Sequence, residues 1–353
     1  MVPLAACATL ADAASGDRDL PNAGAGPFRE LKKGELAGLL IAPNVVSDGK
    51  TLARHATVID ADGDPSTFAV IGYFAANQNG EAPEEAPSRI VRGVAFDGRS
   101  FERETDVVLE ATEDWEYGEI SSPSVVEVGG EVWLYYAAGV GIGLARSVDS
   151  QVFTKVDGPP FFEEGGAGPI FGIADAGWDA GATPTSPSVI SLGDEGLAMF
   201  YEVRLQSGKY AIGEARSKDG ITWKRFGDGP VLVPGEPGEG AYDDARVGAP
   251  CAIAGETALG RPLLRLYYSA ESGAGKRTIG MAARFEDGEF ERAASPVLGA
   301  GSSRGPSEPS VIAFEGFTLL FATQDKSGTQ EEPVVAAGVA PAQAVLPPAT
   351  ESD

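Results

Sequence analysis

The chain has 353 residues, with 52 acidic against 27 basic side chains and a formal net charge of −25. An acidic surface of this kind repels phosphate backbones and anionic membranes, which excludes nucleic acid as an expected partner and leaves neutral sugars, polyols and cations. The same acidity is also compatible with plain solubility. The 47 glycines and 25 prolines favour short strands joined by tight turns, so we expect an all-β fold.

The first residues predict an extracytoplasmic protein. Leu4-Ala5-Ala6-Cys7 resembles the lipobox of bacterial lipoproteins, in which the cysteine is acylated and becomes the mature N-terminus. Only six residues precede Cys7, fewer than a charged start and an apolar region need, so a chance match is the alternative. We expect residues 1–33 to be a flexible leader of a periplasmic or cell-surface protein, anchored through Cys7 if the motif is used. No apolar run reaches the 18 residues of a transmembrane helix.

An apolar segment over residues 36–46 predicts an outer strand, and five repeats follow it. Each repeat opens with a short strand rich in Val and Ile, a turn of Gly and Asp, and an aromatic strand. The five openings are His55-Ala56-Thr57-Val58-Ile59, Ser122-Pro123-Ser124-Val125-Val126, Ser186-Pro187-Ser188-Val189-Ile190, Gly248-Ala249-Pro250-Cys251-Ala252-Ile253 and Glu308-Pro309-Ser310-Val311-Ile312.

The repeats are spaced by 67, 64, 62 and 60 residues, measured between Ala56, Pro123, Pro187, Ala249 and Pro309. Their aromatic strands are apolar almost throughout, which indicates burial on both faces. A third strand follows in each repeat, and four of these run into an acidic turn with a nearby aromatic residue. We predict a five-bladed β-propeller over residues 34–346, with residues 39–46 closing the last blade and residues 347–353 as a tail.

These repeats carry a family resemblance. Segments reading Ser-Pro-Ser-Val, Leu-Tyr-Tyr and Ile-Gly-x-Ala-x-Ser-x-Asp-Gly-x-x-Trp make the chain resemble the superfamily of glycoside hydrolase families 43, 32, 62 and 68, over about residues 36–346. The resemblance implies carbohydrate chemistry in the central channel, where the openings converge. Family 43 enzymes hold catalytic carboxylates at the first, third and fourth openings. The matching positions here are His55, Ser186 and Gly248, so that set does not carry over.

A displaced set of acids is the alternative route to hydrolysis. Glycoside hydrolysis requires an ionised carboxylate and a proton donor on either side of the sugar. Glu308 heads the fifth opening at the channel position, and Asp243 and Asp244 lie just before the fourth. His55, the only histidine, stands at the first opening and can act as an acid or a base. These four are the candidate catalytic residues.

Aromatic and polar side chains near the openings are candidates for sugar binding, by stacking and by hydrogen bonds to hydroxyl groups. The alternatives are that the tryptophans pack between blades and that Glu202 pairs with Arg204 as an internal salt bridge. The candidate substrate-binding residues are Trp115, Trp178, Asp179, Ser122, Ser186, Glu202, Arg204 and Arg246.

Neither a metal nor a cofactor is expected. Asp60, Asp62 and Asp64 resemble the start of a calcium loop, but Ile71 stands where such a loop has its bidentate Glu, so a plain turn is favoured. Cys251, alone inside a predicted strand, is expected to be a core residue. The sequence therefore predicts a carbohydrate-active propeller that binds a neutral glycan and hydrolyses it if a displaced carboxylate set is assembled. A non-catalytic glycan-binding or scaffold propeller is the alternative.

Overall fold

The structure is a computed structural model that describes residues 28–30, 53–63, 69–77, 87–95, 101–103, 107–160, 167–238, 241–256, 262–285, 288–299, 305–314, 317–325 and 333–341. Within these residues the fold is all-β, and helix is limited to two short 3-10 turns, η2 (Asp114–Glu116) and η3 (Gly193–Glu195). None of the described helices has the length and apolar character needed to span a bilayer.

The described strands form five antiparallel sheets, numbered here in chain order. The first sheet holds β2 (Ala53–Asp60), β3 (Val70–Ala76), β4 (Arg89–Ala95) and β5 (Glu102–Arg103), with β6 (Leu109–Glu110) also paired with β4. The second holds β7 (Ile120–Val128), β8 (Glu131–Ala138), β9 (Gly141–Ser147) and β10 (Thr154–Val156), with β11 (Phe171–Gly172) also paired with β9. The third holds β12 (Thr185–Ser191), β13 (Leu197–Arg204), β14 (Tyr210–Ser217) and β15 (Lys224–Arg225).

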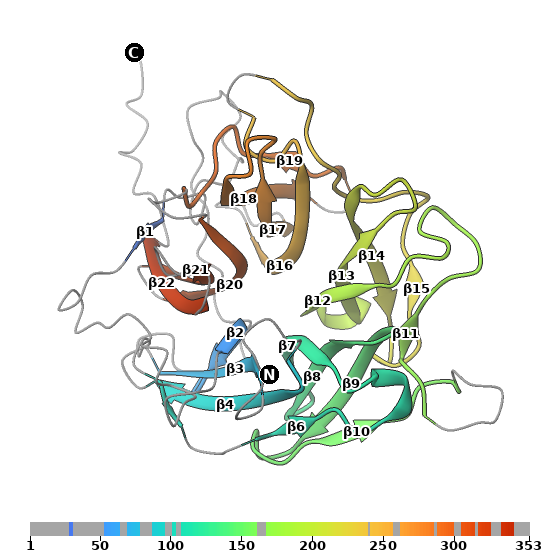
Figure 1. Cartoon of the computed structure of the whole chain (residues 1–353). Helices are drawn as coiled ribbons and strands as arrows, with labels where there is room; N and C mark the ends of the chain where they lie inside the picture. Colours follow the sequence, from blue (N-terminus) through green and yellow to red (C-terminus); the bar gives the residue numbers. More distant parts are fainter. Residues whose placement is uncertain are drawn as a thin grey trace.

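The fourth sheet holds β16 (Arg246–Glu256), β17 (Pro262–Glu271), β18 (Arg277–Phe285) and β19 (Glu291–Arg292), and the fifth holds β20 (Pro306–Phe314), β21 (Phe317–Asp325), β22 (Pro333–Pro341) and β1 (Arg29–Glu30). Figure 1 shows the sheets arranged around a common centre. Their first strands contact one another in the cyclic order β2, β7, β12, β16, β20 and back to β2. The fold is a β-propeller of antiparallel blades.

The fifth sheet takes its outer strand from the N-terminal part of the chain. β1 pairs with β22, with Arg29 opposite Val339 and Glu30 opposite Gly338. Residues 39–46, which the sequence predicted for this place, lie outside the described residues, and β1 falls within the segment assigned to the leader. Phe28, just before β1, is buried and meets Tyr267 of the fourth sheet edge-on, with ring centroids 6.1 Å apart.

The second strand of each sheet forms the core because neighbouring sheets cover both of its faces. In β13, Ala198, Met199, Phe200 and Tyr201 are all fully buried. Successive side chains of a strand point to opposite faces. Accordingly, Met199 packs in a cluster with residues of the second sheet, and Phe200 packs in one with residues of the fourth. This explains why these strands are apolar throughout.

Two of the predicted acidic turns lie among the described residues, and the structure confirms both. The Asp219 carboxylate accepts the backbone N–H groups of Ile221 and Thr222 at 2.9 and 2.7 Å. The Asp149 carboxylate accepts those of two residues in the same way, at 2.9 and 2.8 Å. These hydrogen bonds favour the ionised carboxylates and lower the pKa of each to about 2. The predicted turns at Asp97 and Asp287 lie outside the described residues.

Candidate functional site

All five first strands have the same irregularity at the same place. Each shows a shift in strand register, and at each shift one residue other than glycine has a left-handed φ. The five residues and their φ values are His55 51°, Ser122 46°, Ser186 48°, Ala249 42° and Glu308 56°. A left-handed conformation costs such residues on the order of 1–2 kcal/mol each, and such strain collects at functional sites. We call these five the channel residues.

The channel residues converge on one end of the central channel. Together with the residue that follows each of them, they line a narrow cavity of about 30 Å³. In the fourth sheet the channel residue is Ala249, followed by Pro250, and not Gly248 as the sequence alignment predicted. Gly248 has a different role, because a Cβ atom on it would lie 2.2 Å from Oε2 of Glu202. The correction leaves the fourth channel position still without a carboxylate.

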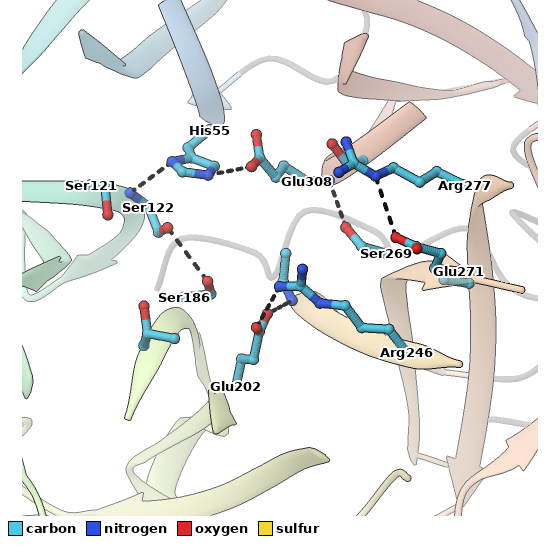
Figure 2. Close-up of a pocket in the computed structure, with 14 residues that line it drawn as sticks. His55, Ser121, Ser122, Ser186, Glu202, Arg246, Ser269, Glu271, Arg277 and Glu308 are labelled. Atoms are coloured by element: carbon cyan, nitrogen blue, oxygen red, sulfur yellow. Dashed lines mark hydrogen bonds and ion pairs between the residues drawn. The ribbon is translucent and has the colours of Figure 1, made fainter. Parts of the chain in front are cut away.

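A larger cavity of about 240 Å³ opens beside the channel residues, and Figure 2 shows its lining. His55, Ser122, Ser186 and Glu308 line it, as the sequence predicted for channel positions. Glu202 and Arg246, both predicted to bind substrate, also line it. Two charged residues that line it, Glu271 and Arg277, were missed by the sequence analysis. Three carboxylates, two guanidinium groups and the single imidazole thus share one cavity.

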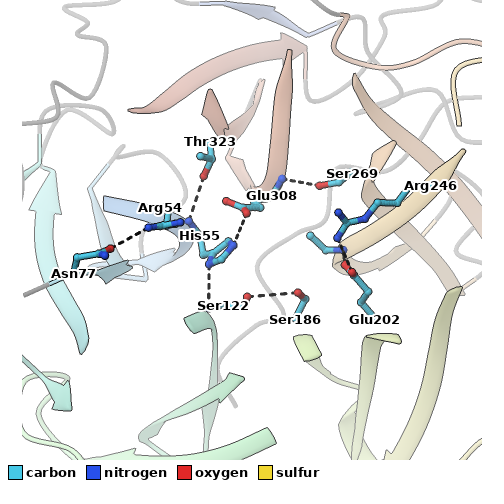
Figure 3. A network of polar contacts seen from close by, with 11 residues as sticks. Arg54, His55, Asn77, Ser122, Ser186, Glu202, Arg246, Ser269, Glu308 and Thr323 are labelled. Carbon is cyan, nitrogen blue, oxygen red and sulfur yellow. Dashed lines mark hydrogen bonds and ion pairs between the residues drawn. The ribbon is translucent and has the colours of Figure 1, made fainter. Parts of the chain in front are cut away.

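His55 and Glu308 are joined by a hydrogen bond between the first and fifth sheets, which Nε2 of His55 donates to the Oε1 atom of Glu308 (Figure 3). The backbone N–H of Ser122 donates to Nδ1 of His55 at 3.4 Å, and the backbone N–H of His55 donates to the Thr323 hydroxyl at 3.2 Å. Burial raises the pKa of Glu308, but His55, the Thr323 hydroxyl and the charge of Arg54 together lower it to about 2. Glu308 is therefore an ionised carboxylate and not a proton donor near neutral pH.

Glu202 and Arg246 form a second pair, between the third and fourth sheets. Oε1 of Glu202 accepts from Nη2 of Arg246 at 2.7 Å, and Oε2 accepts the backbone N–H of Ala249 at 2.7 Å. The guanidinium of Arg246 also lies over the ring of Tyr210, 4.0 Å from its centroid. Burial lowers the pKa of Arg246, but Glu202, Tyr210 and Glu271 together raise it by more, so the guanidinium stays charged. The predicted partner of Glu202, Arg204, is instead exposed and lies 5.9 Å from the Tyr210 centroid.

Glu271 and Arg277 form a third pair, 3.5 Å apart, at the cavity end of the fourth sheet. Glu271 lies opposite Arg246 on one neighbouring strand and opposite Arg277 on the other. Directly opposed residues of a sheet share a face, so these three side chains form one row across β16, β17 and β18. The sequence held a signal for this row. Glu271 ends the second strand of the fourth repeat and Arg277 begins the third, so the two charges lie on either side of one short turn.

The two predicted stacking tryptophans pack against tyrosines of the blades, Trp115 buried and Trp178 partly buried, and neither lines the cavity. Trp115 is 3% exposed and stacks on Tyr136, with ring centroids 6.1 Å apart. Trp178 stacks on Tyr201 in the same way at 6.3 Å. Each tryptophan packs with residues of two neighbouring sheets, which is the alternative given above, packing between blades.

The acids that follow such aromatic residues are held by a repeated contact. Asp179 accepts from the Tyr201 hydroxyl at 3.0 Å and pairs with Arg225 at 2.7 Å. Glu116, in the turn η2 before the second sheet, has the same kind of partners, Tyr136 at 2.8 Å and Lys155 at 2.7 Å. We call this arrangement of a buried acid, a tyrosine and a base a clamp. Asp179 therefore does not reach the cavity.

Asp243 occupies the third clamp, with the Tyr268 hydroxyl at 2.8 Å and Arg292 at 3.1 Å. Its neighbour Asp244 accepts the backbone N–H of Gly273 at 2.8 Å. Neither aspartate lines the cavity. The structure does not bring the predicted catalytic pair, Glu308 with Asp243 or Asp244, together there.

The remaining candidate sites have ordinary partners. Asp60 accepts the backbone N–H groups of Asp62 and Gly63, which makes a turn, and Asp64 lies outside the described residues. Among the residues that the structure describes, no group of three His, Cys, Asp or Glu side chains is placed to hold a metal ion. Burial raises the pKa of the Cys251 thiol to about 12, so the thiol is unreactive near neutral pH.

No protein-family model matches the chain, and no curated protein is similar to it in sequence. Solved structures do resemble it in fold. BT0996, in its complex with RGII, has a TM-score of 0.65 at 15% identity, over 86% of this protein and 90% of the other. A thermostable family-43 glycoside hydrolase has a TM-score of 0.59 at 17% identity, over 84% and 91%. An endo-arabinase from Bacteroides thetaiotaomicron has a TM-score of 0.54 at 18% identity, over 84% and 96%.

At these identities the likeness concerns the fold. The chain has the β-propeller architecture seen in glycoside hydrolases, which agrees with the resemblance found in its repeats. What the molecule does must be argued from the cavity itself.

Proposed function

We propose that this protein binds a saccharide in the central cavity and does not hydrolyse it. The observation behind this proposal is that each carboxylate of the described cavity is paired with a base, in the pairs Glu202 with Arg246, Glu271 with Arg277, and Glu308 with His55. Hydrolysis needs a protonated acid opposite an ionised base. Glu308, with its lowered pKa, cannot supply the proton, and the carboxylates of Glu202 and Glu271 are each held by a guanidinium group.

The chemistry of the cavity suits hydroxyl groups. A sugar hydroxyl donates one hydrogen bond and accepts others, so a wall that alternates guanidinium donors with carboxylate acceptors matches it. Ser122 and Ser186 add small hydroxyl groups on the other side. The likeness in fold to carbohydrate-active propellers supports the same class of ligand.

Hydrolysis by a different acid pair is the second candidate, because Glu202, Glu271 and Glu308 share the cavity. The expected result with aryl glycosides and with neutral oligosaccharides is binding without release of products. Turnover that disappears in Glu308→Gln would overturn the non-catalytic proposal and identify an enzyme.

Binding is tested by a glycan array followed by titration calorimetry. Glu271→Gln removes one acceptor from the cavity and should weaken binding about tenfold, which corresponds to about 1.4 kcal/mol. The matched control is Glu195→Gln, the same change at a side chain that is 74% exposed. If no glycan binds, or if both variants bind as the unaltered protein does, the proposal is wrong.

We further propose that the five sheets are five blades of one ring, that this ring is the domain of residues 34–346 with β1 added at its outer edge, and that the protein is extracytoplasmic.

Cys7 lies outside the described residues, so acylation there stays a prediction. It is tested by expression in a bacterial host with a lipoprotein pathway. A lipid-modified mass should be found in the membrane fraction and should be lost in Cys7→Ser, whereas an unmodified Cys7 would rule out the anchor.

A further inference from the structure

The channel residues differ in what they contact. Four of them form an arc around the channel (Figure 3). Glu308 pairs with His55, His55 accepts the backbone N–H of Ser122, and the hydroxyl of Ser122 lies 3.5 Å from that of Ser186. The fifth channel residue, Ala249, has only a methyl group. The arc therefore ends at Ser186 of the third sheet and at Glu308 of the fifth. Between them, at the channel position of the fourth sheet, only the methyl group of Ala249 reaches the cavity.

The wall next to Ala249 is built from other residues. The backbone N–H of Ala249 is satisfied by Glu202, so the backbone there needs no further partner. Beside it stands the row Arg246, Glu271 and Arg277 across three strands. In Figure 2 the guanidinium groups of both arginines extend from the fourth sheet toward the middle of the cavity. Both the arc and the row have contacts of their own, but only the row places charged donors and acceptors beside Ala249.

The channel is narrow where the five channel residues meet. The narrow cavity between the channel residues measures about 30 Å³, which is about the share of one water molecule in the liquid. A polymer cannot pass through it. The cavity above, at about 240 Å³, is smaller than the roughly 300–1,000 Å³ of pockets that enclose drug-sized ligands. The larger cavity therefore accommodates about one sugar residue, and a glycan chain cannot thread onward between the channel residues.

Charge selects against an acidic sugar. The two arginines of the row are matched by Glu202 and Glu271, and Glu308 adds a third carboxylate beside His55. A uronate would bring a further negative charge into this group, in a chain whose formal net charge is −25. A neutral ring with adjacent hydroxyl groups adds no charge and uses the alternating donors and acceptors.

We propose that the cavity binds a single neutral residue at the end of a glycan, seated over Ala249 against the row Arg246, Glu271 and Arg277, and that Ala249 determines whether the sugar fits. The proposal rests on the proposed saccharide binding and adds where the sugar sits, its charge class and the residue that selects it.

The test compares Ala249→Asn with Ala249→Gly. Both residues tolerate the left-handed φ of 42° better than alanine does, so neither adds backbone strain. Asparagine places a polar side chain in the space over the fourth sheet, whereas glycine leaves that space open. The probes are D-xylose, L-arabinose, D-mannose, D-galactose and their neutral trisaccharides, with tri-galacturonic acid as the charged counterpart, in saturation-transfer NMR and calorimetry.

We expect a neutral probe to bind the unaltered protein and Ala249→Gly within about threefold of each other, and Ala249→Asn to bind it at least about tenfold more weakly. If Ala249→Asn binds as the unaltered protein does, the proposed seat is wrong. If tri-galacturonic acid binds and the neutral sugars do not, the charge class is wrong while saccharide binding stands. If no probe binds the unaltered protein, saccharide binding itself is wrong.

Thermal unfolding shows whether Ala249→Asn is folded. If Ala249→Asn does not fold, Arg277→Gln replaces it as the test, because it removes the guanidinium group at the outer end of the row. We expect Arg277→Gln to weaken the neutral probe about tenfold as well, and unchanged binding would overturn the proposed seat.

Discussion

His55 and Glu308 join the first and fifth sheets at the cavity. The pair is only partly exposed, at 20% and 23% of the two side chains, and the Thr323 hydroxyl adds a contact from the same side. Two polar residues in strained conformations thus serve both the cavity and the contact between sheets. Their role in stability can be separated from their role in binding by changing the pH.

The first prediction concerns acid stability. The pKa of Glu308 is about 2 in the folded protein, below the ordinary 4.5, so folding is stabilised by this group above about pH 4.5 and the contribution is lost as the pH falls toward 2. It amounts to at most about 3 kcal/mol. Urea unfolding between pH 2 and 7 should show a steeper loss of stability in the unaltered protein than in Glu308→Gln.

Glu195→Gln, at the exposed surface, is the control for this experiment and should follow the unaltered protein at every pH. Parallel curves for the unaltered protein and Glu308→Gln would show that the surroundings of Glu308 do not hold the carboxylate in its charged form.

At the scale of the elements, the clamps of the second, third and fourth sheets fix the loops that lead into the first strands. In the third sheet, Tyr201 lies opposite Gly213, where a Cβ atom would lie 2.5 Å from the tyrosine ring. The ring covers the glycine, and its hydroxyl reaches the buried Asp179. The loop before β12 is thereby held beside the strand that carries Ser186 into the cavity.

The second prediction separates the two contacts of this clamp. Asp179→Asn leaves Arg225 without its buried anion and should cost about 3–5 kcal/mol, whereas Tyr201→Phe removes one hydrogen bond and should cost about 1 kcal/mol. Chemical unfolding measures both, and Asp194→Asn at the exposed turn η3 is the control. Equal effects of Asp179→Asn and the control would refute a structural role for the clamp.

At the scale of the whole molecule, the N-terminal part of the chain packs between the last two sheets. Phe28 belongs to a buried cluster with Tyr267 of the fourth sheet and Leu320 of the fifth, and its N–H donates to Val297 at 2.6 Å. β1 follows directly and pairs with β22. Residues far apart in the sequence thus hold the outer part of the ring together.

The third prediction tests this contact. Phe28→Ala should destabilise the protein by about 3–5 kcal/mol, the range for truncating a buried phenylalanine. The measurement is thermal or chemical unfolding, with Val148→Ala as the control because Val148 is 81% exposed. A loss no larger than that of the control would mean that the N-terminal segment contributes nothing to the stability of the ring.

The architecture was largely predictable because its signals are local and repeated. Aromatic strands that are apolar on both faces, turns built on Asp149 and Asp219, and openings rich in Val and Ile recur along the chain, and each reports the burial or turn chemistry of its own segment. Channel positions at His55, Ser122, Ser186 and Glu308 followed from the same repeats. The channel position of the fourth sheet was misplaced by one residue, at Gly248 instead of Ala249, because a register shift cannot be read from residue types alone.

The pairing of charges was decided only by the tertiary structure. From the sequence, Glu202 and Arg204 are neighbours, and Trp178 and Asp179 stand beside an opening, yet Glu202 pairs with Arg246 of the next sheet and Asp179 is buried in a clamp. Side chains of different sheets meet at distances set by strand register and ring geometry, which no single segment encodes. The sequence by itself thus determined a propeller with an uncommon set of channel residues, and the fold decided which of its acids face the cavity.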